Sequence, residues 1–562
     1  MKNLFTLFLG ICAVGVTTAQ VSITDADLVA GQTYNWTNNN TYLLDGLVFL
    51  EEGGVLNIQE GTVIKFTEQT AGTASALVIC RGAKINAIGT QDAPIIFTAA
   101  IDDVNDPTDL GPSDVQLWGG LVLLGKATTE KNGLYEVSIE GIASTEPRGL
   151  YGAPSNNPTN FDDNDNSGEL RYVSIRHTGY GLTSGSELQG LTLGGVGRGT
   201  KLSFVDIYAS SDDGMEIFGG TVDIKNFCVA FAEDDSYDFD EVWKGKGQFL
   251  FSLQRADVAD AGWEYDGSTP NNTAAHTSST IYNFTHIGSG PGAAASNPIG
   301  LLIRAGGSVI AANGIVAQMK GRGIEIQDDS ANTTTDSYSR LLAGETEIKN
   351  NLFHAIGSAT ALDGSANGII RISSNPGDET AEALATHLAL TNQIADPAFV
   401  SISRDQDGLL DPRPSATGAA YTTPLATYPN GDTFFTAVNY KGAISSEAND
   451  CYIAKWTTLA KNGHLAQGLN WSGAATIKPY NNVLEDLKVF PNPTNNIVNI
   501  QINTNENVVV DVFNAEGRMV RSVETGSGQS TTSLPVSDLA PGLYMLRFSN
   551  ANASFSQKLF VY

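Results

Sequence analysis

The chain has 562 residues, of which 41% are hydrophobic and 17% charged, and its formal net charge is −29. This length exceeds one ordinary globular core, so two or more folded units are expected, and the hydrophobic fraction excludes a largely disordered protein. The negative charge excludes nucleic acid as a partner, because phosphate binding needs a basic surface; it suits solubility and, in many acidic proteins, divalent cations.

Residues 1–19 are predicted to form a cleavable secretory signal peptide. Lys2 supplies the positive start, residues 4–16 the apolar run, and residues 17–19 a small-residue cleavage site before Gln20. The run is too short to span a membrane permanently, and no later stretch has the apolar length of a transmembrane helix. The alternative interpretation is a buried N-terminal helix.

Three cysteines remain after removal of this segment, at Cys80, Cys228 and Cys451. Their wide spacing fits neither a disulfide framework nor a zinc site with short ligand spacing. They are expected to be small core residues, and one disulfide with a leftover thiol is the alternative.

The N-terminal part of the chain repeats short strands. Residues 54–62 are echoed by residues 82–90, which lie 28 positions on, and an apolar strand follows each copy, at 63–66 and 95–98. The strands that precede them, 47–50 and 77–80, are also about one repeat apart. Because the alternation slips by one residue between copies, the period is better defined than the register.

A second repeat runs through the middle of the chain, where glycine precedes an aliphatic-x-aliphatic strand at Gly214, Gly300, Gly323 and Gly368. Between these strands lie segments in which Asn precedes an apolar residue, and Asn tolerates the left-handed backbone of a tight corner. The corner residues are Asn226, Asn283, Asn313 and Asn351.

This irregular period predicts a parallel β-solenoid with insertions rather than the alternative, a β-propeller, because no motif recurs at blade spacing. Inward positions are expected to hold Ile58, Ile85, Ile217 and Ile326. Residues 378–392 are the one stretch that predicts a surface helix.

The strings at 81–90, 94–98 and 117–125 resemble those of secreted right-handed parallel β-helix proteins from bacteria that use type IX secretion. Similar strings occur at 167–173, 218–221 and 245–249, and segments between 411 and 457 resemble the part that closes the module. The resemblance implies an all-β fold over residues 20–483 and a location outside the cytoplasm. It implies no activity.

Residues 484–562 predict a small antiparallel β-sandwich, with six short strands separated by Pro- and Gly-containing turns. This unit resembles the type A sorting domain of type IX secretion, which implies export to the cell surface or the medium and the secretion machinery as partner. A fibronectin-like appendage is the alternative. The matching sorting-motif residues are Pro491, Asn492, Pro493, Gly517, Pro541, Gly542, Tyr544 and Lys558.

Acidic residues are densest at Asp212-Asp213 and over residues 233–241. In an extended strand Asp238 and Asp240 point to the same side, and Asp234 approaches through the preceding turn. Converging carboxylates suit Ca²⁺, which takes six to eight oxygen ligands and relieves their repulsion. The sequence therefore suggests calcium as a cofactor at Asp234, Asp238 and Asp240, and a solvated turn is the alternative.

Two shorter acidic strings begin like EF-hand loops, at residues 163–168 and 405–411, but each lacks the closing bidentate Glu. Both are expected to be Asx-rich turns. No catalytic motif is complete either: Asp212-Asp213 has no partner motifs of a polygalacturonase, and the histidines show no metal-ligand spacing.

The preferred hypothesis is an exported, non-catalytic β-helix protein that binds glycans or surfaces. Aromatic residues near the acidic stretch offer sugar-stacking groups if exposed and core residues if buried: Trp243, Phe249, Trp263 and Tyr265. The alternative is a calcium-dependent polysaccharide-degrading, lyase-like enzyme, which needs a free Arg or Lys beside the carboxylates. The available arginines are Arg255, Arg304, Arg322 and Arg371.

Overall fold

The computed structural model describes residues 19–68, 75–183, 186–268, 275–295, 298–329, 332, 334–358, 360–362, 370–373, 388, 391–472, 488–504, 508–514, 519–525, 528–549 and 554–562. The predicted signal peptide, apart from Ala19, and nearly all of the predicted helix at 378–392 lie outside these residues. The chain divides into two compact units, residues 1–472 and 473–562. Each unit is described by itself.

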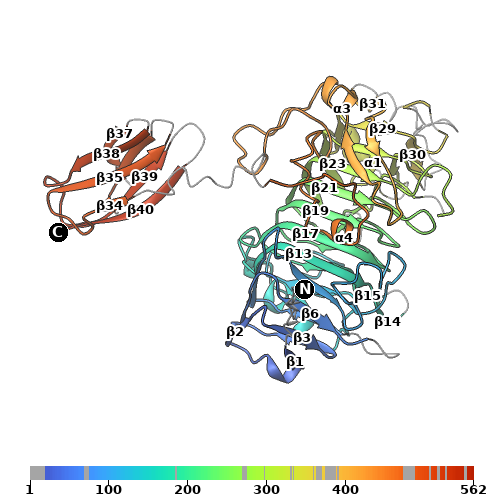
Figure 1. The fold of residues 1–562 in the computed structure, drawn as a ribbon, viewed down its shortest axis with the longest axis horizontal. Coiled ribbons are helices and arrows are strands. Elements are labelled where there is room, and N and C mark those ends of the chain that lie inside the picture. Colours follow the sequence, from blue (N-terminus) through green and yellow to red (C-terminus); the bar gives the residue numbers. More distant parts are fainter. Residues whose placement is uncertain are drawn as a thin grey trace, which may run out of the picture. The chain divides into compact units, whose positions relative to one another are not determined.

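The first unit is a parallel β-helix, as the repeats predicted. Its strands stack in sequence order from β1 upward, coloured blue to yellow in Figure 1. One of its faces is a ten-stranded parallel sheet, here called sheet B. In stacking order its strands are β4 (Leu47–Leu50), β7 (Ala76–Ile79), β10 (Leu121–Leu124), β16 (Leu191–Gly194), β18 (Met215–Phe218), β20 (Tyr237–Asp240), β22 (Trp263–Asp266), β24 (Leu301–Arg304), β27 (Ile324–Gln327) and β30 (Ile370–Ser373).

The other large parallel sheet is sheet A. It begins as two ladders of short strands, which continue as one ladder of longer, bent strands and then divide into two ladders again. The first ladder is β1 (Ala19–Ile23), β3 (Asn40–Leu44), β6 (Val63–Phe66) and β9 (Ile95–Ala99), and the second is β2 (Thr33–Trp36), β5 (Val55–Ile58) and β8 (Lys84–Ile88). The long strands are β13 (Gly168–Thr178), β17 (Lys201–Ser210), β19 (Ile224–Ala230), β21 (Lys246–Leu253) and β23 (Ser278–Ile287). The ladders end in β25 (Ser308–Ala312) and β28 (Glu347–Lys349), and in β26 (Ile315–Ala317), β29 (Leu352–His354) and β31 (Gln393–Ile394).

Alternation within each strand sends every second side chain into one continuous apolar interior. Ile58, Ile85, Ile217 and Ile326 all point inward and are buried, which confirms that prediction. Val48 pairs with Leu77, and Leu56 with Ile85, each 29 positions apart. The spacing of paired residues in the structure is therefore one residue longer than the 28-residue spacing of the sequence repeat.

The long strands of sheet A bend at one column of residues with positive φ. Asn226, Asn283 and Asn313 occupy this column as predicted, with φ of 60°, 54° and 57°. On the last rung the corner falls one residue earlier than predicted, at Asn350 (φ 55°) rather than Asn351. Tyr172, Phe204 and Phe249 adopt the same backbone on other rungs, so the corner is imposed by stacking and Asn is only its easiest occupant.

Residues 396–472, here called the strap, run back over the outside of sheet A. They contain β32 (Phe399–Ser401), β33 (Asp411–Pro414), α3 (Ala419–Thr422) and α4 (Thr458–Lys461). Two corner asparagines bind the strap backbone: Asn283 Nδ2 donates to Tyr440 O at 2.9 Å, and Asn313 Nδ2 donates to Ala426 O at 3.0 Å.

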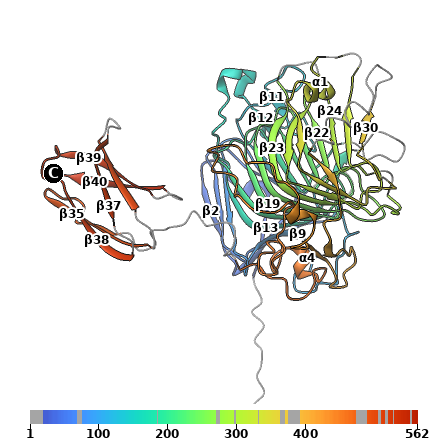
Figure 2. The same ribbon diagram turned by 90° about the horizontal axis from the view of Figure 1, so that it is seen from above.

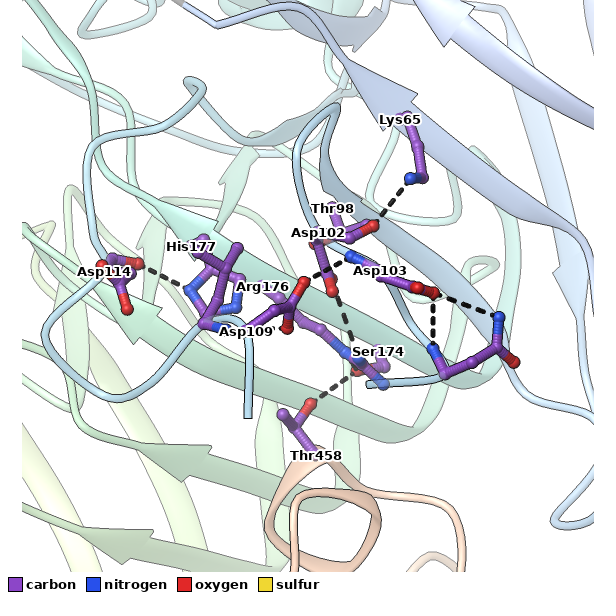
Figure 3. A network of polar contacts seen from close by, with 12 residues as sticks. Lys65, Thr98, Asp102, Asp103, Asp109, Asp114, Ser174, Arg176, His177 and Thr458 are labelled. Carbon is purple, nitrogen blue, oxygen red and sulfur yellow. Dashed lines mark hydrogen bonds and ion pairs between the residues drawn. The ribbon is translucent and has the colours of Figure 1, made fainter. Parts of the chain in front are cut away.

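A buried polar network fixes α4 to sheet A (Figure 3). Asp206 Oδ2 accepts hydrogen bonds from Ser174 Oγ (2.8 Å) and from the Thr458 amide (2.8 Å) and hydroxyl (2.7 Å). Arg176 Nε donates to Ser174 Oγ at 3.0 Å, and its guanidinium lies 3.8 Å from the Asp102 carboxylate. The network lies beneath the strap, and within it Asp206 Oδ1 is buried and has no hydrogen-bond partner in the described part of the chain.

The outside of the first rungs of sheet B is also covered, by an insertion between β10 and β13 that contains β11 (Glu136–Ser138) and β12 (Leu150–Gly152). Its Ile139 and Tyr151 pack on outward residues of the sheet such as Phe49 and Val122. Viewed along the stack in Figure 2, this hairpin and α4 lie on opposite sides of the solenoid.

The other helices and hairpins of the first unit are short. They are η1 (Asp25–Asp27), η2 (Pro147–Gly149), η3 (Pro154–Asn156), η4 (Pro158–Asn160), α1 (Ser337–Leu342) and the hairpin of β14 (Gly181–Thr183) with β15 (Ser186–Glu187). Cys80, Cys228 and Cys451 are free and buried, as expected for core residues. Among the described residues no helix has the length and apolarity needed to cross a bilayer.

The second unit is antiparallel. One sheet contains β34 (Lys488–Phe490), β35 (Ile497–Thr504) and β38 (Gly528–Pro535), and the other contains β37 (Met519–Thr525), β36 (Val508–Phe513), β39 (Gly542–Ser549) and β40 (Ser554–Val561). Their inner side chains share one core, which includes Val498, Val510 and Leu546. This arrangement is the sandwich that the turns and short strands predicted.

Candidate functional site

Outward positions of sheet B carry carboxylates on successive rungs. Glu216 of β18 pairs in register with Asp238 of β20, which pairs with Glu264 of β22. Neighbouring strands lie about 4.8 Å apart, so these three side chains form a ladder. The next rung breaks it, because Leu302 of β24 occupies the same position.

A second outward column lies two residues further along each strand. It contains Asp240 and Asp266, and it ends at Arg304, which pairs in register with Asp266. The turns that lead into β18, β20 and β22 add further carboxylates: Asp212, Asp213, Asp234, Asp235 and Asp260. We call the outward side chains of β18, β20 and β22, with these turns, the acidic face.

Three triplets of carboxylates on the acidic face each have oxygen atoms within 4.8 Å of one another. They are Asp213, Glu216 and Asp238; Asp212, Asp213 and Asp234; and Asp234, Asp235 and Asp260. Because Asp213 and Asp234 are each shared, the triplets form one continuous row of oxygen ligands. Such a donor set fits a hard divalent cation such as Ca²⁺.

Asp238 shows most directly that this row is electrostatically uncompensated. Its Oδ1 is buried, and no group in the described part of the chain donates a hydrogen bond to it. Burial, then the neighbouring Asp213 carboxylate, raises the pKa of Asp238 well above its usual range. The pKa values of Asp213 and Glu216 are raised in the same way, by burial and then by Asp212 and Asp238 respectively. A bound cation would give Asp238 Oδ1 a partner and would offset the repulsion between the neighbouring carboxylates.

Basic groups pair with three other carboxylates on or beside this face: Glu264, Asp266 and Glu241. The Arg304 guanidinium contacts the Glu264 carboxylate and, through Nε at 2.7 Å, Asp266 Oδ1. At the other side Lys131 Nζ, from the insertion, lies 2.5 Å from Glu241 Oε1, and Tyr151 donates its hydroxyl proton to Glu241 Oε2. None of these ion pairs involves a carboxylate of the triplets.

The structure separates the three predicted calcium ligands. Asp234 and Asp238 each lie beside Asp213 but belong to different triplets, and Asp240 belongs to none of them. Calcium binding by Asp234, Asp238 and Asp240 stays a prediction. Sequence reasoning missed Glu216 and Asp260. The repeat could have indicated Glu216. It is the residue between the two apolar positions of the strand that follows Gly214, and such a residue faces outward; stacking of the strands then places it beside Asp238.

The sugar-stacking interpretation of the aromatic residues is wrong. Trp243, Trp263 and Tyr265 point into the solenoid core, and Phe249 is buried at a corner, where its carbonyl accepts from Tyr452. Residues that alternate with outward carboxylates on a strand must face inward, and Trp263 and Tyr265 do so beside Glu264.

The EF-hand-like strings form turns. Asp163 Oδ1 accepts hydrogen bonds from the Thr128 amide and hydroxyl, and Asp407 accepts from Ser403 and the Leu409 amide. In the described residues neither string contributes to a carboxylate triplet.

Most sorting-motif residues lie on or beside the last strands of the second unit. Asn492, in the turn after β34, binds β40 twice: its Nδ2 donates to Lys558 O at 2.8 Å, and its Oδ1 accepts from the Phe560 amide at 3.0 Å. Tyr544 on β39 donates to Ala540 O at 2.8 Å, next to Pro541 and Gly542. Gly517 lies outside the described residues.

Comparison with known proteins agrees with this architecture. Residues 29–389 match the family described as pectate-lyase like beta helix domain, and residues 488–562 match the secretion system C-terminal sorting domain. A search of curated proteins finds no match.

Two solved structures of a bacteriophage tailspike show 9% identity to this chain. The enzymatically active domain of CBA120 tailspike protein 2 has a TM-score of 0.20, with 92% of this chain and 72% of that chain covered. The full-length tailspike protein 2 of an Escherichia coli O157:H7 bacteriophage has a TM-score of 0.16, with 92% and 64% covered. These scores support no conclusion about function. The family match spans more than half of the sequence, so this chain belongs to the pectate-lyase-like β-helix family, and its type IX sorting domain directs it to the cell surface or the medium.

Proposed function

We propose that this exported protein is a non-catalytic binding protein that holds divalent cations, foremost Ca²⁺, on its acidic face and uses them to attach to extracellular glycans or other anionic polymers. The bound cation would rest on Asp213, Glu216 and Asp238, with Asp212, Asp234, Asp235 and Asp260 extending the row. Such a cation would supply open coordination positions for oxygen atoms of the ligand.

The observation that carries the proposal is the buried, unpartnered Oδ1 of Asp238 inside a carboxylate triplet. A solvated acidic turn, the alternative interpretation, would place its oxygens in water. Here Asp213, Glu216 and Asp235 are buried and Asp238 is half-buried, while Asp234 and Asp260 are exposed. Carboxylates buried next to one another are costly unless protons or cations neutralise them.

Glycan recognition through stacked aromatic rings is not available on this face, because Trp243, Trp263 and Tyr265 fill the core. Attachment is therefore expected to depend on the cation and on the carboxylates around it. Ligands with carboxylate, sulfate or vicinal hydroxyl oxygens fit this chemistry best. Export to the cell surface or the medium brings the protein into contact with polymers of this kind.

One observation favours the lyase-like alternative: Arg304 lies on the same side of sheet B as the triplets. A lyase needs a basic group that can accept a proton from its substrate. Arg304 is held by Glu264 and Asp266, and these carboxylates raise its pKa despite its partial burial. With this raised pKa Arg304 is deprotonated more rarely and is less available to accept a proton, so binding is the better-supported function.

The test measures retention of the purified protein on insoluble acidic polysaccharides, with Ca²⁺ and with a chelator. The proposal expects calcium-dependent retention that Asp238→Asn weakens at least tenfold, with no release of unsaturated sugar ends. Equal retention in Ca²⁺ and chelator would contradict it. Calcium-dependent release of unsaturated products, abolished in Arg304→Gln, would establish the enzyme instead.

A further inference from the structure

The acidic face is bounded by two of the protein's own cations. Arg304 lies at one end, on β24. On this strand the first column no longer holds a carboxylate, because Leu302 occupies that position. Lys131 lies at the side where β20 ends, and reaches in from the insertion that contains β11 and β12. Between these two positions every rung of sheet B presents a carboxylate outward.

Arg304 neutralises the last rung of the ladder. Its guanidinium contacts Glu264 of the first column and Asp266 of the second column at the same time. Both carboxylate side chains are mostly buried, with 12% and 23% exposed, whereas the side chain of Arg304 is 43% exposed. A planar guanidinium suits this double contact, which a lysine ammonium reproduces only as a point charge.

Lys131 neutralises the opposite side in the same manner. Its ammonium contacts Glu241, whose side chain is completely buried, and Tyr151 supplies a hydrogen bond to the other carboxylate oxygen. The charge of Glu241 is therefore neutralised by the insertion. Asp238, only three residues before it, has an oxygen with no donor in the described structure.

We infer that Arg304 and Lys131 are built-in counter-ions that set the extent of the cation row. They occupy Glu264, Asp266 and Glu241, and so confine exchangeable cations to the triplets around Asp213 and Asp234. Without Arg304, Glu264 and Asp266 would lose this positive partner, although they lie on the strand next to that of Asp238. They would then resemble the triplets, in which neighbouring carboxylates lie close together and take part in none of these ion pairs. This inference rests on the proposed function, because it concerns cations on the same face.

Calcium titration of the full chain by isothermal calorimetry tests the inference. Arg304→Gln is the informative variant, since Arg304 is partly exposed and its loss should leave the fold intact. Its calcium stoichiometry should rise by about one ion per chain, because two or more additional carboxylates become available. Arg304→Lys keeps the positive charge and should keep the wild-type stoichiometry. Arg413→Gln is the matched control, because it frees Asp411 of the strap, away from sheet B, and should add no ion.

The outcomes separate the two proposals. If the wild type binds calcium and Arg304→Gln binds the same number of ions, the counter-ion role is wrong while the proposed function survives. Binding by Arg304→Gln alone would support the counter-ion role and contradict the proposed function. If neither protein binds calcium, both are overturned.

Discussion

Glu216 and Asp238 stand opposite one another on neighbouring parallel strands, and with Asp213 their carboxylate oxygens lie within 4.8 Å. Parallel stacking in register turns one outward acidic position per rung into a column of like charges. Like charges that lie directly opposite one another on neighbouring strands destabilise the sheet unless they are compensated. Among the described residues, the ion pairs at the borders of this face are those of Arg304 and Lys131, and they leave a row of carboxylates suited to exchangeable cations.

Export depends on the C-terminal sandwich. Deleting residues 484–562 should leave the protein in the periplasm, because the sorting domain is read after passage through the inner membrane. Immunoblots of periplasm, cell surface and medium provide the measurement. The truncated protein should melt like the β-helix of the full-length chain, since each unit is compact and has its own core. Unchanged amounts at the surface or in the medium would contradict this role.

The Asp206 network should hold the strap to the solenoid. Asp206→Ala removes the acceptor of three hydrogen bonds and leaves buried donors on Ser174 and Thr458 without it, so the free energy of unfolding should fall by about 3 kcal/mol. Hydrogen exchange should increase first in residues 451–466. The exposed Asp106→Ala, which also removes an accepting aspartate, should change stability by less than about 0.5 kcal/mol. Equal effects of the two variants would show that the network does not hold the strap.

His286 should make the β-helix sensitive to mild acid. It lies in the core, where burial lowers its pKa to about 3, and its ring bonds to Ser252. The imidazole is therefore neutral in the folded state, while the unfolded chain takes up a proton below its ordinary pKa near 6.5. Stability from this residue is complete above about pH 6.5 and is lost as the pH falls toward 3, by about 1.4 kcal/mol per pH unit.

Urea unfolding at pH 7 and pH 5 measures this effect. The wild type should lose about 2 kcal/mol more than His286→Gln, which can still hydrogen-bond to Ser252 but does not titrate. The difference between the two proteins isolates His286 from other titrating groups. A parallel loss in both would mean that His286 does not cause the sensitivity.

Alternation and repeat length were sufficient to predict the β-helix, and they placed Ile58, Ile85, Ile217 and Ile326 in the core correctly. They did not reveal which outward residues become neighbours, because the loops between rungs vary in length and the register follows from stacking rather than from local sequence. For this reason Glu216 was missed, although it stands beside Asp238. The direction of Trp263 and Tyr265 could not be predicted for a similar reason. They alternate along the strand with Glu264 and Asp266, and this alternation shows that they point inward only once the carboxylates are known to face outward.

Calorimetric melting of the full chain in Ca²⁺ and in chelator measures whether the acidic face binds Ca²⁺. A cation that binds only the folded state stabilises it by about 2.7 kcal/mol at a hundredfold excess over Kd, so calcium should raise the Tm of the wild type. Asp238→Asn should remove most of this rise and, in chelator, be no less stable than the wild type, because it relieves repulsion from Asp213 and Glu216. Asp240→Asn, outside the triplets, should keep most of the rise. Identical melting curves of the wild type in calcium and in chelator would contradict the account.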